Sequence, residues 1–242
     1  MFLNTILENA LDFVFPAKCM GCGKGGIELC TICLSDAPSA ERESAKWIFP
    51  VYDYRHPLIK KSLWLLKYNG KKRLAKIFAE NIYGKMMEEL SELSLLENFQ
   101  NIILIPIPLS SKRYNERGFN QAELICEELI KISKTNHLTR PLATLSLPRR
   151  GAASEVFLLK TNILVKTKET EHQARIKDRS VRLKNLVGSF AIKNPEQNAE
   201  FLKGKNIILI DDITTTGATL NEARRILKKS GARKVIAFTV AH

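Results

Sequence analysis

Continuous apolar runs and helical repeats divide much of the chain into alternating strands and helices. Three nearly uninterrupted apolar runs, typical of strands buried on both faces of a parallel sheet, are NIILIPIPL (101–109), NIILIDD (206–212) and KVIAFTV (234–240). Between the last two lies a helical repeat, TLNEARRILKKS (219–230), which ends at Gly231, a residue type that favours helix ends. Strand, helix and strand in this order predict a crossover unit, and hence an α/β fold with a parallel sheet.

The middle of the chain adds further elements to this pattern. FPVYDY (49–54) predicts a strand, and residues 57–90 predict two helices separated at Asn69-Gly70. A helical repeat also covers residues 120–133. Weaker strand patterns lie near residues 156–159, 163–167 and 187–192. A chain of this length can build one substantial core and one small accessory unit.

The N-terminal part of the chain differs from the rest in composition. Within residues 1–16, apolar side chains recur at helical spacing up to Pro16, which predicts an amphipathic helix. Residues 17–46 are rich in cysteine and glycine and contain few large apolar residues, so this segment needs a cross-link such as a metal ion or disulfides to fold. We therefore expect an N-terminal helix plus a cysteine element over 1–46, and a larger α/β domain over 47–242.

The charge balance narrows the class of partner. Lys and Arg outnumber Asp and Glu by 38 to 25, a formal net charge of +13, which favours phosphorylated metabolites, nucleic acid or a membrane surface. No stretch is long and apolar enough to span a bilayer. The amino terminus lacks the basic segment of a signal peptide and is interrupted by Glu8 and Asp12, so we expect a cytoplasmic protein. Membrane association of the first helix stays open, although its polar face carries acids.

Four of the five cysteines lie within the sequence CMGCGKGGIELCTIC. Cys19, Cys22, Cys30 and Cys33 form two Cys-x-x-Cys pairs with seven residues between them. Because two intervening residues let each pair turn around one ion, the four thiolates predict a closed, structural Zn²⁺ site in a zinc-ribbon-like element. Two disulfides or a redox pair are the alternatives, disfavoured by a cytoplasmic location and by the doubled motif. Cys126 stands alone in an apolar helical pattern, where we expect a buried, inert thiol.

The stretch IILIDDITTTGAT (207–219) combines two opposite charge preferences. Asp211 and Asp212 come at the carboxyl end of a predicted parallel strand, where ligands bind in such sheets. The loop that follows supplies threonine hydroxyl groups before a helix whose first N–H groups favour an anion. A sugar phosphate, with a divalent cation, suits both parts of this site: its hydroxyl groups and the cation suit the acids, and its phosphate suits the loop. An ordinary helix N-cap explains one acid and one threonine, but not the whole run.

This stretch resembles the phosphoribosyl pyrophosphate (PRPP) motif of type I phosphoribosyltransferases. The resemblance implies that Asp211 and Asp212 contact the ribose hydroxyl groups as catalytic residues. It also implies that the loop holds the 5′-phosphate, and the PRPP-binding residues of this loop are Thr214, Thr215, Thr216, Gly217, Ala218 and Thr219. Purine-salvage members carry a third acid, the catalytic base, where this chain has Thr215. That difference argues against a 6-oxopurine acceptor and leaves no evident base in the loop.

Two other segments, together with the cysteines, resemble the ComF family, whose members join a four-cysteine zinc element to a phosphoribosyltransferase domain. One is PIPLSSKRYNERGFNQAELI (106–125). The other, 166–190, fits the family pattern Thr-x-x-Gln, then Arg-x-x-Asn-x-x-Gly-x-Phe, through Thr170, Gln173, Arg182, Asn185, Gly188 and Phe190. The similarity covers nearly the whole chain in the expected order. Residues 138–160 are longer than the family norm and receive no role.

Basic residues follow the strand at 101–109, at the same end of the sheet as the acidic pair. By resemblance, this loop binds pyrophosphate through Lys112 and Arg113. Arg113 is also a catalytic candidate, because a leaving pyrophosphate gathers negative charge that a guanidinium group and Mg²⁺ stabilise. Candidates for the pocket wall are Arg117, Asn120 and Gln121. A solvated basic loop is the alternative interpretation of Lys112 and Arg113.

Residues 55–76 contain eight Lys or Arg residues and no acid, with Tyr54, Trp64 and Tyr68 interleaved. This combination suits single-stranded DNA, through phosphate contacts and base stacking. The alternative is a helix with a basic solvent face, whose Leu63 and Trp64 point into the core. The sequence as a whole leaves three functions open. The first is a Mg²⁺-dependent phosphoribosyltransferase with an unknown acceptor. The second is a competence accessory protein that binds single-stranded DNA and DNA-uptake proteins, and the third is a non-catalytic PRPP sensor.

Overall fold

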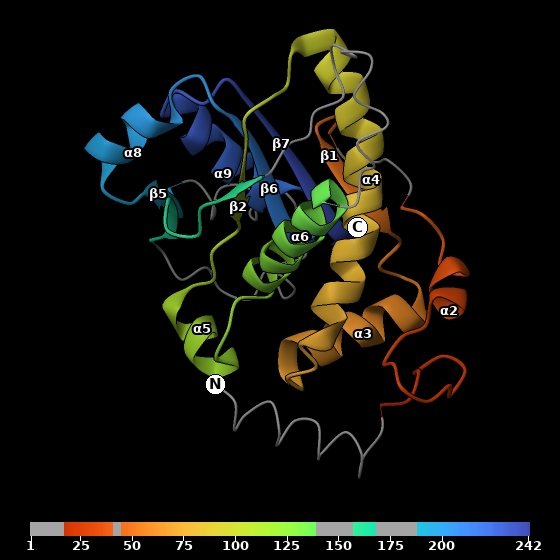
Figure 1. Ribbon diagram of the computed structural model, residues 1–242. Helices are drawn as coiled ribbons and strands as arrows, with labels where there is room; N and C mark the ends of the chain where they lie inside the picture. Colours follow the sequence, from red (N-terminus) through yellow and green to blue (C-terminus); the bar gives the residue numbers. More distant parts are fainter. Residues whose placement is uncertain (1–16, 41–44, 139–156, 168–187) are drawn as a thin grey trace.

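Four stretches of the chain are described by the computed structural model, namely residues 17–40, 45–138, 157–167 and 188–242 (Figure 1). The helix expected over 1–16 lies outside these stretches. So do residues 139–156 and the four pattern positions Thr170, Gln173, Arg182 and Asn185.

A five-stranded sheet in the order β1-β7-β6-β2-β3 forms the centre, and every neighbouring pair in it is parallel. The strands are β1 (Ile48–Tyr52), β2 (Ile102–Pro106), β3 (Leu158–Leu159), β6 (Asn206–Ile213) and β7 (Lys234–Ala241). The three continuous apolar runs are β2, β6 and β7, which are the three inner strands. The predicted α/β fold with a parallel sheet is confirmed.

Helices cover both faces of this sheet because alternate residues of each inner strand point to opposite sides. Ile208 and Ile210 of β6 belong to one core with α3 (Pro57–Tyr68), α4 (Arg73–Glu97) and α6 (Gln121–Leu138). Ile207 and Leu209 belong to a second core with α9 (Ala218–Lys229). In Figure 1, α4 and α6 cross in front of the sheet.

Most of the helix boundaries follow from local sequence. The break between α3 and α4 falls at the predicted Asn69-Gly70, where Gly70 takes a φ of 64° that favours glycine. Residues 120–133 were expected to form a helix, and α6 continues the same pattern to Leu138. None of the helices in the described ranges is both long and apolar enough to cross a membrane.

Three features were not anticipated from the pattern. α5 (Ser111–Arg117) occupies the basic segment that was expected to be a loop, and α8 (Pro195–Leu202) precedes β6. β4 (Leu164–Lys166) and β5 (Phe190–Ile192) form a separate antiparallel pair rather than part of the main sheet. α5 carries no buried residue, so no apolar repeat marks it in the sequence.

The cysteine element packs directly against the larger part of the chain. It contains the short helix α2 (Thr31–Ser35), and its Leu29, Leu34 and Ala37 join the same core as Phe49 of β1. Its folding is therefore linked to the first core. The expected boundary at residue 46 stays a prediction.

Candidate functional site

The acidic pair lies at the carboxyl edge of the sheet, within the last three residues of β6. Asp211 is in register with Thr239 of β7, so it sits beside a central strand. The backbone N–H of Asp212 donates a hydrogen bond to Oδ1 of Asp211 at 2.9 Å. Asp212 itself is buried, with 9% of its surface exposed. Two acidic residues therefore lie next to each other at this edge, Asp212 buried and Asp211 partly buried.

This crowding changes the acid–base behaviour of Asp211. Burial, followed by the negative charge of Asp212, raises the pKa of Asp211 to about 8. The positive charges of Lys67 and Lys166 act in the opposite direction. A carboxyl group with such a pKa gains from a ligand that brings positive charge or hydrogen-bond donors.

The loop after the acids leads into the amino terminus of α9. Thr214 is buried, and its backbone N–H donates to the carbonyl of Ala241 at 2.9 Å, which fixes the start of the loop. Gly217 precedes the helix with a φ of 70°, a conformation that favours glycine. The backbone N–H groups in the first turn of α9 lack partners within the helix, which suits an anion. The structure thus places the expected phosphate loop beside the acidic pair.

The basic residues expected to bind pyrophosphate lie on the neighbouring strand–helix connection. α5 follows β2, which pairs with β6, and Lys112 and Arg113 are in its first turn. Ser110 caps this helix by accepting a hydrogen bond from the backbone N–H of Arg113 at 3.5 Å. Lys112 and Arg113 are thus carried by a capped helix at the same sheet edge as the acids.

The three pocket candidates play different parts. Arg117 donates to Oε1 of Gln121 at 2.9 Å and to the Tyr68 hydroxyl at 3.3 Å, and its guanidinium lies 5.1 Å from the Tyr68 ring centroid. Within the described part of the chain, no partner is found for the buried Nε2 of Gln121. Asn120 donates to the carbonyl of Ile107 and accepts from the N–H of Ala122, so its amide group holds the start of α6.

Two lysines that the sequence did not single out interact with the acids, one by an ion pair and one through its charge. Nζ of Lys67, at the end of α3, lies 2.9 Å from Oδ2 of Asp212. Lys166 comes from β4, and burial, followed by the charge of Arg113, lowers its pKa, while the charge of Asp211 raises it. Lys67 was part of the basic segment 55–76, but nothing in its spacing distinguished it from the other cations there.

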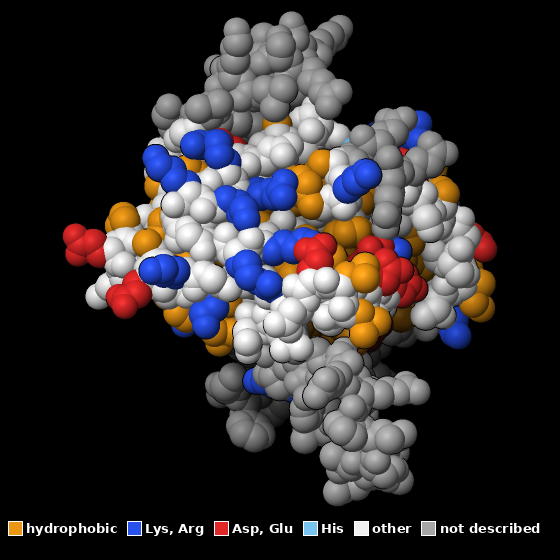
Figure 2. All heavy atoms as spheres, turned by 90° about the horizontal axis from the view of Figure 1, so that it is seen from above, with side chains coloured by type: hydrophobic (Ala, Val, Ile, Leu, Met, Phe, Trp, Pro, Cys, Tyr) orange, Lys and Arg blue, Asp and Glu red, His pale blue; other side chains and the backbone are white. Residues whose placement is uncertain are grey.

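The aromatic residues of that segment lie on the surface of α3. Leu63 is 1% exposed, whereas Trp64 and Tyr68 are 52% and 54% exposed, with ring centroids 5.9 Å apart. The alternative interpretation placed both Leu63 and Trp64 in the core, and it is right for Leu63 but wrong for Trp64. Positive charge is not confined to α3, because Lys and Arg side chains also spread over the end of the molecule where α4 finishes (Figure 2). Charge alone does not select a nucleic-acid face.

The four expected metal ligands come together. The sulfur atoms of Cys19, Cys22, Cys30 and Cys33 all lie within 4.8 Å of one another. No cysteine is in a disulfide, and the sulfur atoms of Cys22 and Cys30 are 3.7 Å apart, well beyond a disulfide bond. Four thiols in one cluster fit a tetrahedral Zn²⁺ ion. Cys126 is fully buried, which raises the pKa of its thiol, as expected for an inert cysteine.

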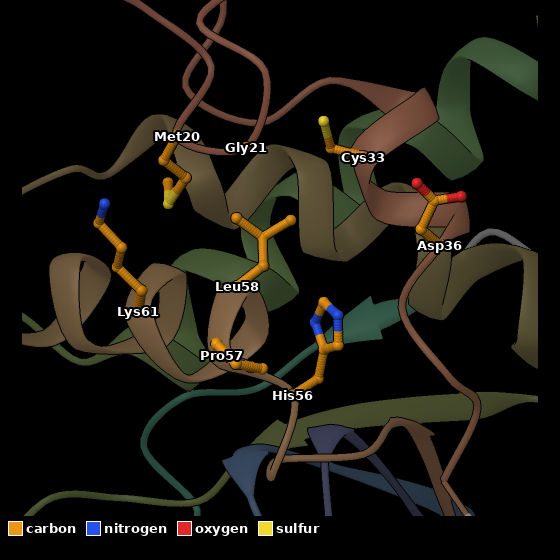
Figure 3. Close-up of a pocket in the computed structure, with 8 residues that line it drawn as sticks. All are labelled: Met20, Gly21, Cys33, Asp36, His56, Pro57, Leu58 and Lys61. Atoms are coloured by element: carbon orange, nitrogen blue, oxygen red, sulfur yellow. The ribbon is translucent and has the colours of Figure 1, made fainter.

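A cavity of about 430 Å³ lies elsewhere, between the cysteine element and the start of α3 (Figure 3). Its lining residues are Met20, Gly21, Cys33, Asp36, His56, Pro57, Leu58 and Lys61. Figure 3 shows Lys61 and Asp36 at opposite sides, with Met20 and Leu58 between them. None of the residues expected to bind PRPP lines this cavity.

Comparison with known proteins agrees with this geometry. Residues 141–242 match the phosphoribosyl transferase domain family, and this region includes the acidic pair and its loop. The chain is 31% identical over 191 residues to competence protein ComFC of Bacillus subtilis strain 168, which covers 78% of this chain. It is 31% identical over 140 residues, 57% of this chain, to competence protein F of Haemophilus influenzae. This chain belongs to the ComF family.

This ComF-family chain is also similar to a DNA utilization protein and to one solved structure. DNA utilization protein YhgH of Escherichia coli O157:H7 is 26% identical over 210 residues, covering 85% of this chain and 74% of the relative. The match spans 62% of the Bacillus protein and 49% of the Haemophilus protein, less than two thirds of either. A hypoxanthine phosphoribosyltransferase from Staphylococcus aureus, 14% identical, overlays on 68% of this chain and 62% of its own at a TM-score of 0.33. At that score the overlay adds nothing to the family assignment.

Proposed function

We propose that this ComF-family protein binds PRPP together with Mg²⁺ and transfers the phosphoribosyl group to an acceptor. The observation that carries the proposal is the joint placement of Asp211 and Asp212 at the end of β6 with a glycine-containing loop and the amino terminus of α9. Hydroxyl groups suit the acids and phosphate suits the loop, and PRPP offers both on one molecule.

Each part of the site has a role in this proposal. The backbone N–H groups and hydroxyl groups of Thr214 to Thr219 hold the 5′-phosphate, and the two acids accept hydrogen bonds from the ribose hydroxyl groups. A nucleophile of the acceptor forms a bond to the anomeric carbon, while the bond from that carbon to the pyrophosphate oxygen breaks. Lys112 and Arg113 stabilise the negative charge that collects on the leaving pyrophosphate. Mg²⁺ would neutralise part of the same charge.

The loop provides no acidic base, and this limits the kind of acceptor that can react. Thr215 stands where purine-salvage enzymes carry an acidic base, and its side chain is exposed. A threonine hydroxyl group does not take up a proton at neutral pH. An acceptor that is already a good nucleophile, such as an amine, therefore fits better than one that needs a carboxylate base.

The test is to incubate the protein with PRPP, Mg²⁺ and a panel of bases, amines and single-stranded DNA, and to follow pyrophosphate release. We expect release with at least one acceptor, abolished by Asp212→Asn. PRPP binding without turnover across the panel would favour the sensor function. If the wild-type protein neither binds PRPP nor releases pyrophosphate, the proposal is wrong.

A second candidate function is a competence accessory role in which the protein binds single-stranded DNA and PRPP acts as a regulatory ligand. The specific observation in its favour is the exposure of Trp64 and Tyr68 on a helix whose charged residues are all basic. The names of the relatives refer to competence and DNA utilization, which agrees with this role. DNA-uptake proteins are then the expected partners, and we keep the cytoplasm as the expected location.

The cysteine cluster is proposed to bind a structural Zn²⁺ ion. With four thiolates the ion has no open position for water or substrate, so its contribution is to folding rather than to chemistry. The contact of Leu29 and Leu34 with the first core explains how the ion can stabilise the rest of the protein.

A further inference from the structure

Lys67 makes an ion pair that links α3 to the acidic pair. Its Nζ atom lies 2.9 Å from Oδ2 of Asp212, and the two side chains are only 16% and 13% exposed. α3 precedes β6 by well over a hundred residues, so this contact joins distant parts of the chain. The pair is more sheltered from water than a surface salt bridge, and such pairs are screened less by solvent.

The ion pair occupies a site already crowded with negative charge. Asp211 and Asp212 are adjacent, and the charges that lower the pKa of Asp211 come from Lys67 and Lys166. The Asp212 N–H of β6 also donates to the Asp211 carboxylate, and Thr239 of β7 is in register with Asp211. Lys67 is the only one of these groups with an ion pair to Asp212 among the described residues.

We propose that Lys67 is a positioning residue of the PRPP site, which holds the Asp212 carboxylate in the orientation in which it accepts a ribose hydroxyl group. The ammonium group engages Oδ2 and leaves the second oxygen for the ligand. This inference rests on the proposed PRPP binding, and it moves one cation of the segment 55–76 from the surface proposed for DNA into the ligand site.

The experiment compares PRPP affinity, in the presence of Mg²⁺, of wild type, Lys67→Met, Lys67→Arg and Lys60→Met. Methionine keeps the apolar stem and removes the charge, so we expect the dissociation constant to rise about tenfold or more. Arginine should recover most of the loss because it keeps a charged donor. Lys60 is exposed on the same helix, so Lys60→Met should bind PRPP like wild type.

Two further readouts separate positioning from general stability. In an Asp212→Asn background, Lys67→Met should cause a much smaller loss than in the wild-type protein, since the ion pair with that carboxylate is already absent. The charge of Lys67 lowers the pKa of Asp211, so its removal should move the pH dependence of PRPP binding to higher pH. If Lys67→Met proves unstable, Lys67→Gln tests the same loss of charge with a polar side chain.

The outcomes are distinguishable. If wild type binds PRPP and a folded Lys67→Met binds it equally well, the inference is wrong while the proposed function stands. The same holds if Lys67→Met binds more tightly, because the ion pair would then compete with the ligand. If wild type does not bind PRPP at all, both are wrong. Loss of single-stranded DNA binding with unchanged PRPP affinity would return Lys67 to the DNA surface and also overturn the inference.

Discussion

Asp211 and Asp212 owe their properties to being neighbours at the end of a buried strand. The backbone N–H of Asp212 donates a hydrogen bond to the Asp211 carboxylate at 2.9 Å, which fixes the position of that carboxylate. Burial, followed by the negative charge of Asp212, raises the pKa of Asp211 to about 8, so this carboxyl group keeps its proton at neutral pH. The free site therefore holds less than two full negative charges at neutral pH.

This state predicts a pH dependence for ligand binding. Mg²⁺ and hydroxyl donors favour the ionised carboxylate, so binding should release the proton of Asp211. Affinity for PRPP with Mg²⁺ should rise as pH increases from about 7 through 8, and level off above about 9. Titration calorimetry in two buffers of different ionisation enthalpy measures the released proton directly. An affinity that falls across this range, or binding without proton release, would contradict this assignment.

At the residue scale, sequence predicted the acids, the loop and the basic pair, but not Lys67 or Lys166. The first group is predictable because its members are close in sequence and follow strands whose carboxyl ends must meet. Lys67 reaches Asp212 across a tertiary contact between α3 and β6, and each of the eight cations in 55–76 was an equal candidate for it. Lys166 lies on a strand outside the main sheet, whose position no local pattern gives.

The cysteine element depends on a close approach at Gly21. A side chain at this position would place its Cβ 2.7 Å from Sγ and 2.9 Å from Cβ of Cys33, one of the four ligands. Gly25 lies in the same element, and a Cβ there meets nothing within 4 Å. Neither glycine has a positive φ, so the two positions differ mainly in space.

Gly21→Ala should therefore weaken zinc binding, by about tenfold or more, because Cys33 must move from its position in the cluster. Gly25→Ala is the matched control and should bind zinc like wild type. A competition titration with a chromogenic chelator reports both affinities, and thermal melting with and without chelator reports the linked stability. Equal zinc affinity in the two variants would show that the cluster does not bind the ion through Cys33 in this geometry.

At the element scale, the prediction was good for elements with a long apolar pattern and failed for α5, which has none. β2, β6, β7 and α9 carry continuous or periodic apolar residues and were found from them. α5 buries no residue and begins at a serine cap, which leaves no periodic trace in seven residues. β4 and β5 were predicted as weak strand patterns near residues 163–167 and 187–192, but three residues each give no local sign that the two strands pair with each other outside the main sheet.

The formal charge of +13 belongs to the whole molecule, and Lys and Arg side chains also gather on the face shown in Figure 2, so total charge does not locate a DNA site. Stacking is the more specific signal, and among the described large apolar side chains Trp64 and Tyr68 are exposed together on α3. Tyr68 also contacts Arg117, next to the proposed PRPP site. The DNA surface and the ligand site would thus adjoin each other.

If α3 binds single-stranded DNA, affinity should fall steeply with salt, and the loss of either ring should cost about 1–3 kcal/mol of binding free energy. Fluorescence anisotropy with a labelled oligonucleotide, measured at several salt concentrations, tests Trp64→Ala and Tyr68→Ala. Leu96→Ala, at an exposed apolar position at the far end of α4, serves as the control. Equal DNA affinity in all of these proteins would remove α3 as the binding surface.

We propose that the acids and the loop at the end of β6 form one PRPP site. The most direct measurement is calorimetric titration of PRPP with Mg²⁺ into the zinc-loaded protein and into the Asp211→Asn, Asp212→Asn double variant. We predict saturable binding of one PRPP per chain in wild type, and binding weaker by about tenfold or more in the double variant. Absence of binding in wild type, or equal affinity in the two proteins, would show that the acids and the loop do not form a PRPP site.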